Sequence, residues 1–365
     1  MKTPRNSANT TLILTGLLGL AAMGVSACSS PDSSVASPSG EAELRQSNGQ
    51  TAPPDQSQDA AFDLADLPQQ PVDALKTLEI LALDGMEGRQ TGTRGGERAR
   101  IWLAQQLKAR GLLFPSEGDV EGTVEGYEHR FSFSQRTGKK MNGVNLIARI
   151  PSRFETPNGP VMIVSAHFDH EGIRVKKGVE EIYNGADDNA SGVAGVLAIA
   201  DHFLANPPDH EVIIALFDAE EMRLQGAKAF LRDEVVDPER IVLNLNFDMI
   251  SRNDDNEIYI AGSYHTPGLK TILAPVIDQA PVTIKYGHDD PKLGSNDWTN
   301  QSDHGPFHKK GIPFVYFGVE DHADYHQPTD VFATIPKDFF LRSIETVIMA
   351  AEQLDRELDE VASLN

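Results

Sequence analysis

The sequence VMIVSAHFD, residues 161–169, is the clearest indication of the fold. Residues Val161 to Ala166 form an almost continuous apolar run, which is typical of a strand buried on both faces of a sheet. His167 and Asp169 follow at the end of this run, and their spacing allows both side chains to point the same way. A buried strand that ends in polar residues predicts an α/β protein with its reactive groups at strand ends.

Similar apolar runs recur along the chain and alternate with segments of helical periodicity. Leu103 and Leu107 lie on one face of such a helix, which Gly111 is expected to end. Strands that alternate with helices predict an α/β sandwich around a mixed, mostly parallel sheet. We predict strands over residues 144–150, 161–166, 212–217, 241–247, 258–261 and 312–317, and helices over residues 97–110, 192–204 and 337–358.

Five residues of metal-binding types are spread along the middle of the chain. Two are histidines and three are carboxylates, a set that suits a pair of zinc ions. All but the last fall just after a predicted strand or in the loop that follows it, and strand ends of this kind meet at one edge of the sheet. We therefore expect one convergent two-metal site. Its predicted ligands are His167, Asp188 in GADDNASG, Glu221 in DAEE, Asp248 in NFDM and His326 in DYHQP.

Neighbours of these ligands would supply the remaining chemistry. Glu220 is left free by ligation of Glu221, so it can take a proton from a metal-bound water and pass it to a leaving amine. Asp169 is predicted to orient His167, because a ligand histidine usually donates its second N–H to an oxygen. His170 has the opposite phase to these two residues and is interpreted as an ordinary loop histidine. The pattern indicates a hydrolase.

Three further polar residues near the last predicted ligand have two interpretations each. The hydroxyl of Tyr325 could stabilise the oxyanion of a tetrahedral intermediate, or its ring could pack the wall of a pocket. Asp303 and His304 could support the metal ligands, or they could have a purely structural role.

The first residues have the pattern of a targeting segment. Lys2 and Arg5 precede an apolar run over residues 12–23 that is short for a membrane span and is typical of a signal peptide. It ends in VSAC, residues 25–28, which resembles the lipobox of bacterial lipoproteins; an ordinary secretory signal followed by a chance cysteine is the alternative. Lipidation would fall on Cys28, the only cysteine of the chain, so no intramolecular disulfide can form.

The composition divides the chain further. Residues 28–70 are rich in Ser, Pro, Gln, Ala and Asp and have few large apolar residues, so we predict a disordered tether after a signal peptide of residues 1–27. Residues 71–365 are long enough for one large catalytic domain. The formal net charge of −22, from 32 basic and 54 acidic residues, argues against nucleic acid or an anionic surface as a partner.

Taken in this order, the motifs resemble peptidase family M28, the co-catalytic zinc aminopeptidases. The resemblance covers about residues 78–340 and includes MEGRQTGTRGGE, residues 86–97, which resembles the family's segment before its first long helix. It implies a three-layer zinc-peptidase sandwich, of the aminopeptidase/phosphorylase-like kind, that binds two zinc ions. Asp188 would bridge them, and the peptide bond after Asp188 would be cis. The resemblance assigns His167 and Asp248 to one zinc, Glu221 and His326 to the other, Glu220 as general base and Tyr325 as a contact of the transition-state oxygen.

The function that these residues imply is removal of N-terminal residues from peptides by a metal-activated water. A carboxypeptidase, dipeptidase or glutaminyl cyclase on the same fold is the alternative within the family. A binding protein that kept the fold and lost the chemistry is the alternative from another class, although such relatives typically lose ligands. The lipobox predicts a lipid-anchored protein of the bacterial cell envelope, and Ser29 after the cysteine favours the outer membrane.

Overall fold

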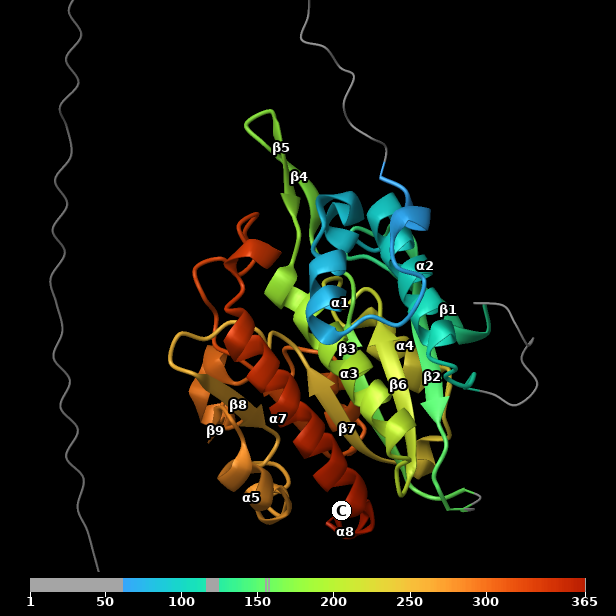
Figure 1. Ribbon diagram of the computed structural model, residues 1–365, viewed down its shortest axis with the longest axis vertical. Coiled ribbons are helices and arrows are strands. Elements are labelled where there is room, and N and C mark those ends of the chain that lie inside the picture. The colour runs from blue at the N-terminus through green and yellow to red at the C-terminus, as the bar shows by residue number, and fades with distance from the viewer. Residues whose placement is uncertain (1–61, 116–124, 155, 157, 365) are drawn as a thin grey trace, which may run out of the picture. The chain divides into compact units, whose positions relative to one another are not determined.

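The computed structural model describes residues 62–115, 125–154, 156 and 158–364 (Figure 1). Within these residues, eight strands form one sheet in the order β1-β2-β6-β3-β7-β10-β8-β9. The neighbours β6, β3, β7 and β10 run parallel, whereas β1, β2 and β8 join antiparallel. The predicted mixed sheet with a parallel centre is confirmed. The strands are β1 (Glu128–Ser134), β2 (Lys140–Ile150), β3 (Val161–His167), β6 (Glu211–Phe217), β7 (Ile241–Phe247), β8 (Glu257–Ala261), β9 (Thr283–Tyr286) and β10 (Phe314–Gly318).

The helices connect these strands, and a separate hairpin stands beside the sheet. The hairpin consists of β4 (Gly172–Lys176) and β5 (Val179–Tyr183), and Figure 1 shows it extending away from the sheet. The helices are α1 (Ala74–Leu81), α2 (Arg94–Ala109), α3 (Gly192–Ala205), α4 (Gln225–Arg232), α5 (Leu269–Gln279), α6 (His304–Lys309), α7 (Lys337–Arg356) and α8 (Leu358–Ser363).

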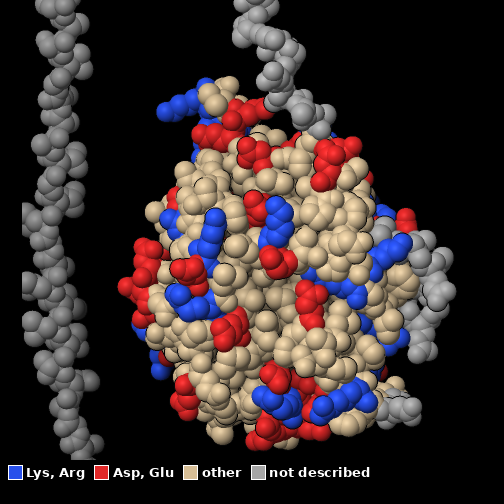
Figure 2. Space-filling model, in the orientation of Figure 1, with Lys and Arg blue, Asp and Glu red and all other residues tan. Residues whose placement is uncertain are grey.

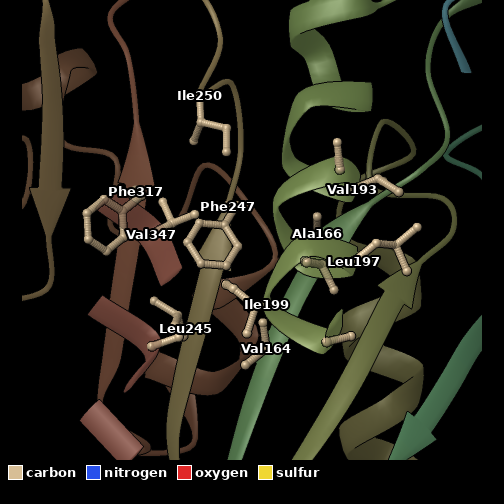
Figure 3. Close-up of a cluster of buried hydrophobic side chains, with 14 of the residues drawn as sticks. Val164, Ala166, Val193, Leu197, Ile199, Leu245, Phe247, Ile250, Phe317 and Val347 are labelled. Atoms are coloured by element: carbon tan, nitrogen blue, oxygen red, sulfur yellow. The ribbon is translucent and has the colours of Figure 1, made fainter. Parts of the chain in front are cut away.

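Helices cover both faces of the sheet because its central strands are apolar on both sides. On β3, Val164 and Ala166 face one core, which α1, α2, α3 and α7 cover. Figure 3 shows Ala166 near Leu197 of α3, and Val164 near Ile199 of the same helix. Ile163 faces a second core, to which α4 and α6 contribute. The alternation along a single strand produces the three layers helix, sheet and helix.

Several elements were not predicted from the sequence. The strand β1 is partly exposed and has a mixed pattern, and β9 has only Thr283–Tyr286, so neither forms an apolar run. The helix α4 follows the polar stretch after β6, so no apolar periodicity in the sequence marks where this helix begins. Predicted elements that do form differ by a few residues at their ends: the last predicted helix divides into α7 and α8 at Glu357.

The packed domain begins before residue 71, which corrects the predicted end of the tether. Phe62, Leu64 and Leu67 pack against the main core, and the carbonyl oxygen of Pro68 accepts hydrogen bonds from side chains of α2, including Gln106 at 3.1 Å. Isolated apolar residues in a polar segment therefore suffice to attach it. The predicted signal peptide and Cys28 lie outside the described residues. Among the helices that are described, none combines the length and apolarity needed to cross a membrane.

Charged residues on the face shown in Figure 2 are of both signs and are interspersed. Acidic side chains outnumber basic ones over the whole chain, with 54 against 32.

Candidate metal centre

The five predicted ligands converge at one edge of the sheet. His167 is the last residue of β3, Glu221 follows β6, Asp248 follows β7, and His326 lies in the loop after β10. These four strands are neighbours and parallel, so their carboxyl ends lie together. Asp188 reaches the same place from the irregular turn Ala186–Ser191, just before α3. The convergence predicted from strand ends is confirmed.

The first half of the centre is built around His167. Its Nε2 lies 3.3 Å from Oδ1 of Asp248 and 3.5 Å from Oδ1 of Asp188. The carboxylate of Glu220 belongs to the same group of potential ligand atoms. The Nδ1–H of His167 donates to the carbonyl oxygen of Asp169 at 3.1 Å, so Nε2 keeps its lone pair for a metal.

The second half contains three side chains beside Asp188 instead of the two that were predicted. His326 Nε2 lies 3.0 Å from Oδ2 of Asp188 and 3.6 Å from Oε1 of Glu221. His170 joins them, with its Nδ1 2.8 Å from Oε1 of Glu221 and 3.6 Å from Oδ2 of Asp188. The interpretation of His170 as an ordinary loop histidine is therefore wrong, because the turn after β3 buries the ring completely and directs it at the carboxylates.

Asp188 stands between the two halves, with one carboxylate oxygen facing each. Its neighbours hold it there: Asp187 accepts hydrogen bonds from the backbone N–H and the hydroxyl of Ser251, and Asn189 donates to the carbonyl oxygen of Phe247. The Asp188–Asn189 peptide bond is cis, as the resemblance implied. Asp330 accepts from the backbone N–H groups of Asp187 and Asp188. In the motif Asp-Asp-Asn, the outer two side chains anchor the turn and the middle one faces the site.

A buried arginine joins the loops that carry the ligands. Arg89 is completely buried and donates to the carbonyl oxygens of Phe168 at 2.8 Å and of Gly185 at 2.9 Å, and also to those of Leu81 and Asn184. Burial lowers its pKa to about 10, with partial compensation by carboxylates of the site. This residue lies in the MEGRQTGTRGGE segment, so part of that motif has a positioning role that the sequence did not reveal.

Asp169 contacts the site differently from the prediction. Its carbonyl oxygen accepts from His167, while its carboxylate lies 3.8 Å from that ring. Carboxylate oxygen Oδ1 instead accepts the backbone N–H of Glu220 at 3.0 Å, and Oδ2 accepts the hydroxyl of Thr91 at 3.1 Å. Asp169 therefore positions both the ligand histidine and the residue predicted as the base.

The electrostatics of the cluster favour occupation by cations. Burial raises the pKa of Glu220 well above its ordinary value, and the carboxylates of Asp303, Asp248 and Glu221 raise it further, against the lowering effect of His167. Buried atoms at the centre also lack partners: among the described residues, Glu221 Oε1 and both ring nitrogens of His170 accept or donate no hydrogen bond. Divalent cations would satisfy these groups and offset the repulsion between carboxylates, so the residues present fit a metal pair.

The centre opens into a cavity of about 440 Å³. Tyr325 lines it, and its ring stacks on His326 with centroids 4.0 Å apart, so the two interpretations of this residue are compatible. Tyr316 lines it as well and donates its hydroxyl to the carbonyl oxygen of Asp248 at 3.0 Å.

Asp303 is buried near Asp248, and neither of its carboxylate oxygens has a hydrogen-bond partner among the described residues. His304 is bonded to the carbonyl oxygen of Trp298, which favours its structural role.

A comparison with protein families matches residues 145–351 to the model of peptidase family M28, which is more than half of the chain. The chain belongs to peptidase family M28. The matched range contains every predicted metal ligand of this M28 chain, from His167 to His326.

Individual relatives of this M28 chain are distant. It is 26% identical over 222 residues to the aminopeptidase YwaD of Bacillus subtilis, a match that covers 57% of this chain and 42% of that relative. The chain therefore spans less than half the length of this curated relative. Among solved structures, BSAP, a zinc aminopeptidase from Bacillus subtilis, superposes with a TM-score of 0.59 at 16% identity, covering 78% of this chain and 95% of that one.

A second solved structure has the same degree of similarity. The glutaminyl cyclase of Porphyromonas gingivalis superposes with a TM-score of 0.59 at 19% identity, covering 82% of this chain and 99% of that one. Both structural matches establish the three-layer zinc-peptidase fold. Because one fold carries two different activities, the function must be argued from the site.

Proposed function

We propose that this chain is a di-zinc aminopeptidase that hydrolyses N-terminal residues from peptides. The observation that carries the proposal is the position of Asp188, with Oδ1 facing His167 and Oδ2 facing His326. A carboxylate placed in this way can bridge two cations. His167 and Asp248 would hold one zinc, and Glu221 and His326 would hold the other.

The chemistry follows from what surrounds the metal pair. Bound zinc would polarise the scissile carbonyl and lower the pKa of a water toward ~7. Glu220 lies with the His167 group and is not needed as a ligand, so its carboxylate can accept the proton of that water and pass it to the leaving amine. Asp169 holds the backbone of Glu220 in place through the 3.0 Å hydrogen bond to its N–H.

Tyr325 is proposed to donate its hydroxyl to the oxygen that develops negative charge. The ring lines the same cavity as the metal ligands and packs on His326, which supports this role. Burial, followed by the charges of Asp188 and Asp248, raises the pKa of Tyr325 above its ordinary value. The phenol therefore stays protonated at neutral pH and remains a donor.

A panel of reporter substrates tests the activity. We expect leucine p-nitroanilide to be hydrolysed, and its N-acetylated form and hippuryl-phenylalanine to be left intact. A chelator should lower the rate about 100-fold or more and added zinc should restore it, since the water is activated by the metals. Hydrolysis of the acetylated substrate, or cyclisation of glutaminyl substrates instead of their hydrolysis, would replace the aminopeptidase proposal by one of the alternative activities.

The place of action is proposed from the N-terminal sequence alone. Residues 1–27 would be removed as a signal peptide and Cys28 would carry a lipid, which would tether the catalytic domain to the bacterial envelope, with the outer membrane favoured by Ser29. Peptides outside the cytoplasm would then be the substrates.

A further inference from the structure

His170 has the geometry of an additional metal ligand. Four donor atoms surround one point in the second half of the centre: His170 Nδ1, Asp188 Oδ2, Glu221 Oε1 and His326 Nε2. His170 Nδ1 lies 2.8 Å from the Glu221 oxygen and 3.6 Å from the Asp188 oxygen. His326 Nε2 lies 3.0 Å from the Asp188 oxygen and 3.6 Å from the Glu221 oxygen. Donors at tetrahedral zinc, each about 2.0 Å from the ion, lie roughly 3.3 Å apart.

The surroundings of His170 leave metal binding as the use of its ring. The side chain is completely buried, and neither ring nitrogen has a hydrogen-bond partner among the described residues, which is costly for an imidazole. Gly185 makes the space for the ring, because a Cβ there would lie 2.6 Å from it.

We propose that His170 is the fourth protein ligand of the second zinc, which makes the two metal positions unequal. This inference rests on the proposed two-metal centre. Asp188, Glu221, His326 and His170 would complete a tetrahedral shell. His167, Asp248 and Asp188 would leave a position open, and that is the half in which Glu220 lies. Three protein ligands with an open position are typical of catalytic zinc, and four of structural zinc.

Cadmium NMR tests this ligand without any measurement of activity. The protein, labelled with ¹⁵N at histidine, is loaded with ¹¹³Cd²⁺, and couplings between cadmium and ring nitrogens are recorded. We expect two cadmium resonances, with His167 coupled to one and both His170 and His326 coupled to the other. Coupling of His326 alone to the second resonance would overturn the proposal. A protein that binds no cadmium would instead refute the metal centre itself.

Zinc affinity of a variant gives the second measurement. His170→Asn should lower the zinc affinity of one of the two sites more than about tenfold and leave the affinity of the other within about twofold. Loss of a side chain that only orients a ligand already lowers metal affinity by about tenfold or more, and loss of a ligand should lower it at least as much. His202→Asn, on the outer part of α3, is the matched control and should change neither site. Unchanged affinity at both sites of His170→Asn would mean that the ring only packs.

A different observation indicates which substrates the cavity accepts. Arg223, Lys228 and Lys309 line the same cavity as the metal ligands, and within the described residues none of the three forms an ion pair. Lys228 donates to the backbone carbonyl oxygen of Arg223 at 2.7 Å. Burial lowers the pKa of Lys228, and the charges of Lys309 and Arg223 lower it further against the raising effect of Asp303 and Glu220.

We infer that these three cations receive a substrate carboxylate, so that short peptides with a free C-terminus or an acidic side chain near the scissile bond are preferred. The inference rests on the proposed peptidase activity. The cavity would then offer carboxylates and metals together with these three cations, in a chain whose net charge is −22. A zwitterionic short peptide matches these charges, with its amine toward the carboxylates and its carboxylate toward the cations.

Three dipeptides test the carboxylate preference: Leu-Leu, its C-terminal amide, and Leu-Glu amide. We expect kcat/KM for Leu-Leu and for Leu-Glu amide to exceed that for Leu-Leu amide by about fivefold or more, as for a partly exposed ion pair. Lys228→Met and Lys309→Met should each reduce these ratios, whereas Lys310→Met, at an exposed lysine outside this cavity, should not. Equal kcat/KM values of the wild-type enzyme for all three dipeptides would refute the carboxylate preference. Absence of hydrolysis of all three would refute the proposed peptidase activity.

Discussion

Glu220→Gln is expected to lower kcat by about 10²–10⁴-fold while two zinc ions remain bound. Glutamine has nearly the same shape but cannot take a proton from a water, so the variant loses proton transfer alone. The side chain lies beside His167 and Asp248, where burial holds the pKa of the carboxyl well above its ordinary value. Steady-state kinetics together with metal analysis of the purified variant measure the two quantities separately.

Two other glutamates sharpen this test. Glu221→Gln, one position along the chain, should lose zinc from the second half of the centre, because Oε1 of Glu221 lies among the donor atoms of His170 and His326. Glu239→Gln, at an exposed position before β7, should change neither metal content nor rate. If Glu220→Gln turned over at a near-normal rate, or lost its metal as Glu221→Gln does, the assignment of the base would be wrong.

Asp188→Asn is expected to reduce bound zinc below two ions per chain and to abolish detectable turnover. The carboxylate of Asp188 has one oxygen facing His167 and the other facing His326. An amide keeps one of these two oxygens but loses the other and the negative charge, so it cannot bind both zinc ions through oxygen. Saturating zinc should therefore raise the Tm of the wild-type protein much more than that of the variant. At a free zinc concentration of 100 Kd, each occupied site contributes about 2.7 kcal/mol.

The metal-free proteins provide a further measurement for this variant. Asp188 is one of several buried carboxylates at the centre, so its neutralisation removes repulsion and should leave the metal-free variant at least as stable as the metal-free wild type. Asp359→Asn, at an exposed position of α8, is the control for the change from carboxylate to amide. Full zinc content and wild-type stabilisation by zinc in Asp188→Asn would show that Asp188 does not bridge the metals.

Most of the centre could be predicted because its residues follow apolar strands. The runs that precede His167, Glu221 and Asp248 have the composition of parallel strands, and parallel strands bring their carboxyl ends together. His170 could not be found in this way. Alternation along an extended chain placed it opposite to His167 and Asp169, but the chain turns directly after β3 and the alternation no longer applies there.

Arg89 illustrates a second limit. An arginine in a glycine-rich polar segment is expected at the surface, yet this one is buried among carbonyl oxygens that come from residues 81, 168, 184 and 185. Hydrogen bonds of this kind join segments that are distant in the sequence and have no local pattern. The early strand β1 and the hairpin β4–β5 were missed for a related reason, since partly exposed strands have weak apolar alternation.

The sequence by itself determined the layered α/β architecture, the strands whose ends carry ligands, and the residue types at the metal centre. Tertiary structure decided which oxygen of Asp188 faces which histidine, that His170 joins Glu221 and His326, and that three cations without an ion pair in the described part of the chain line the cavity. The physical reason is the range of the interactions. Burial of apolar strands follows from local periodicity, whereas distances between donor atoms depend on how loops from β3, β6, β7 and β10 pack together at the edge of the sheet.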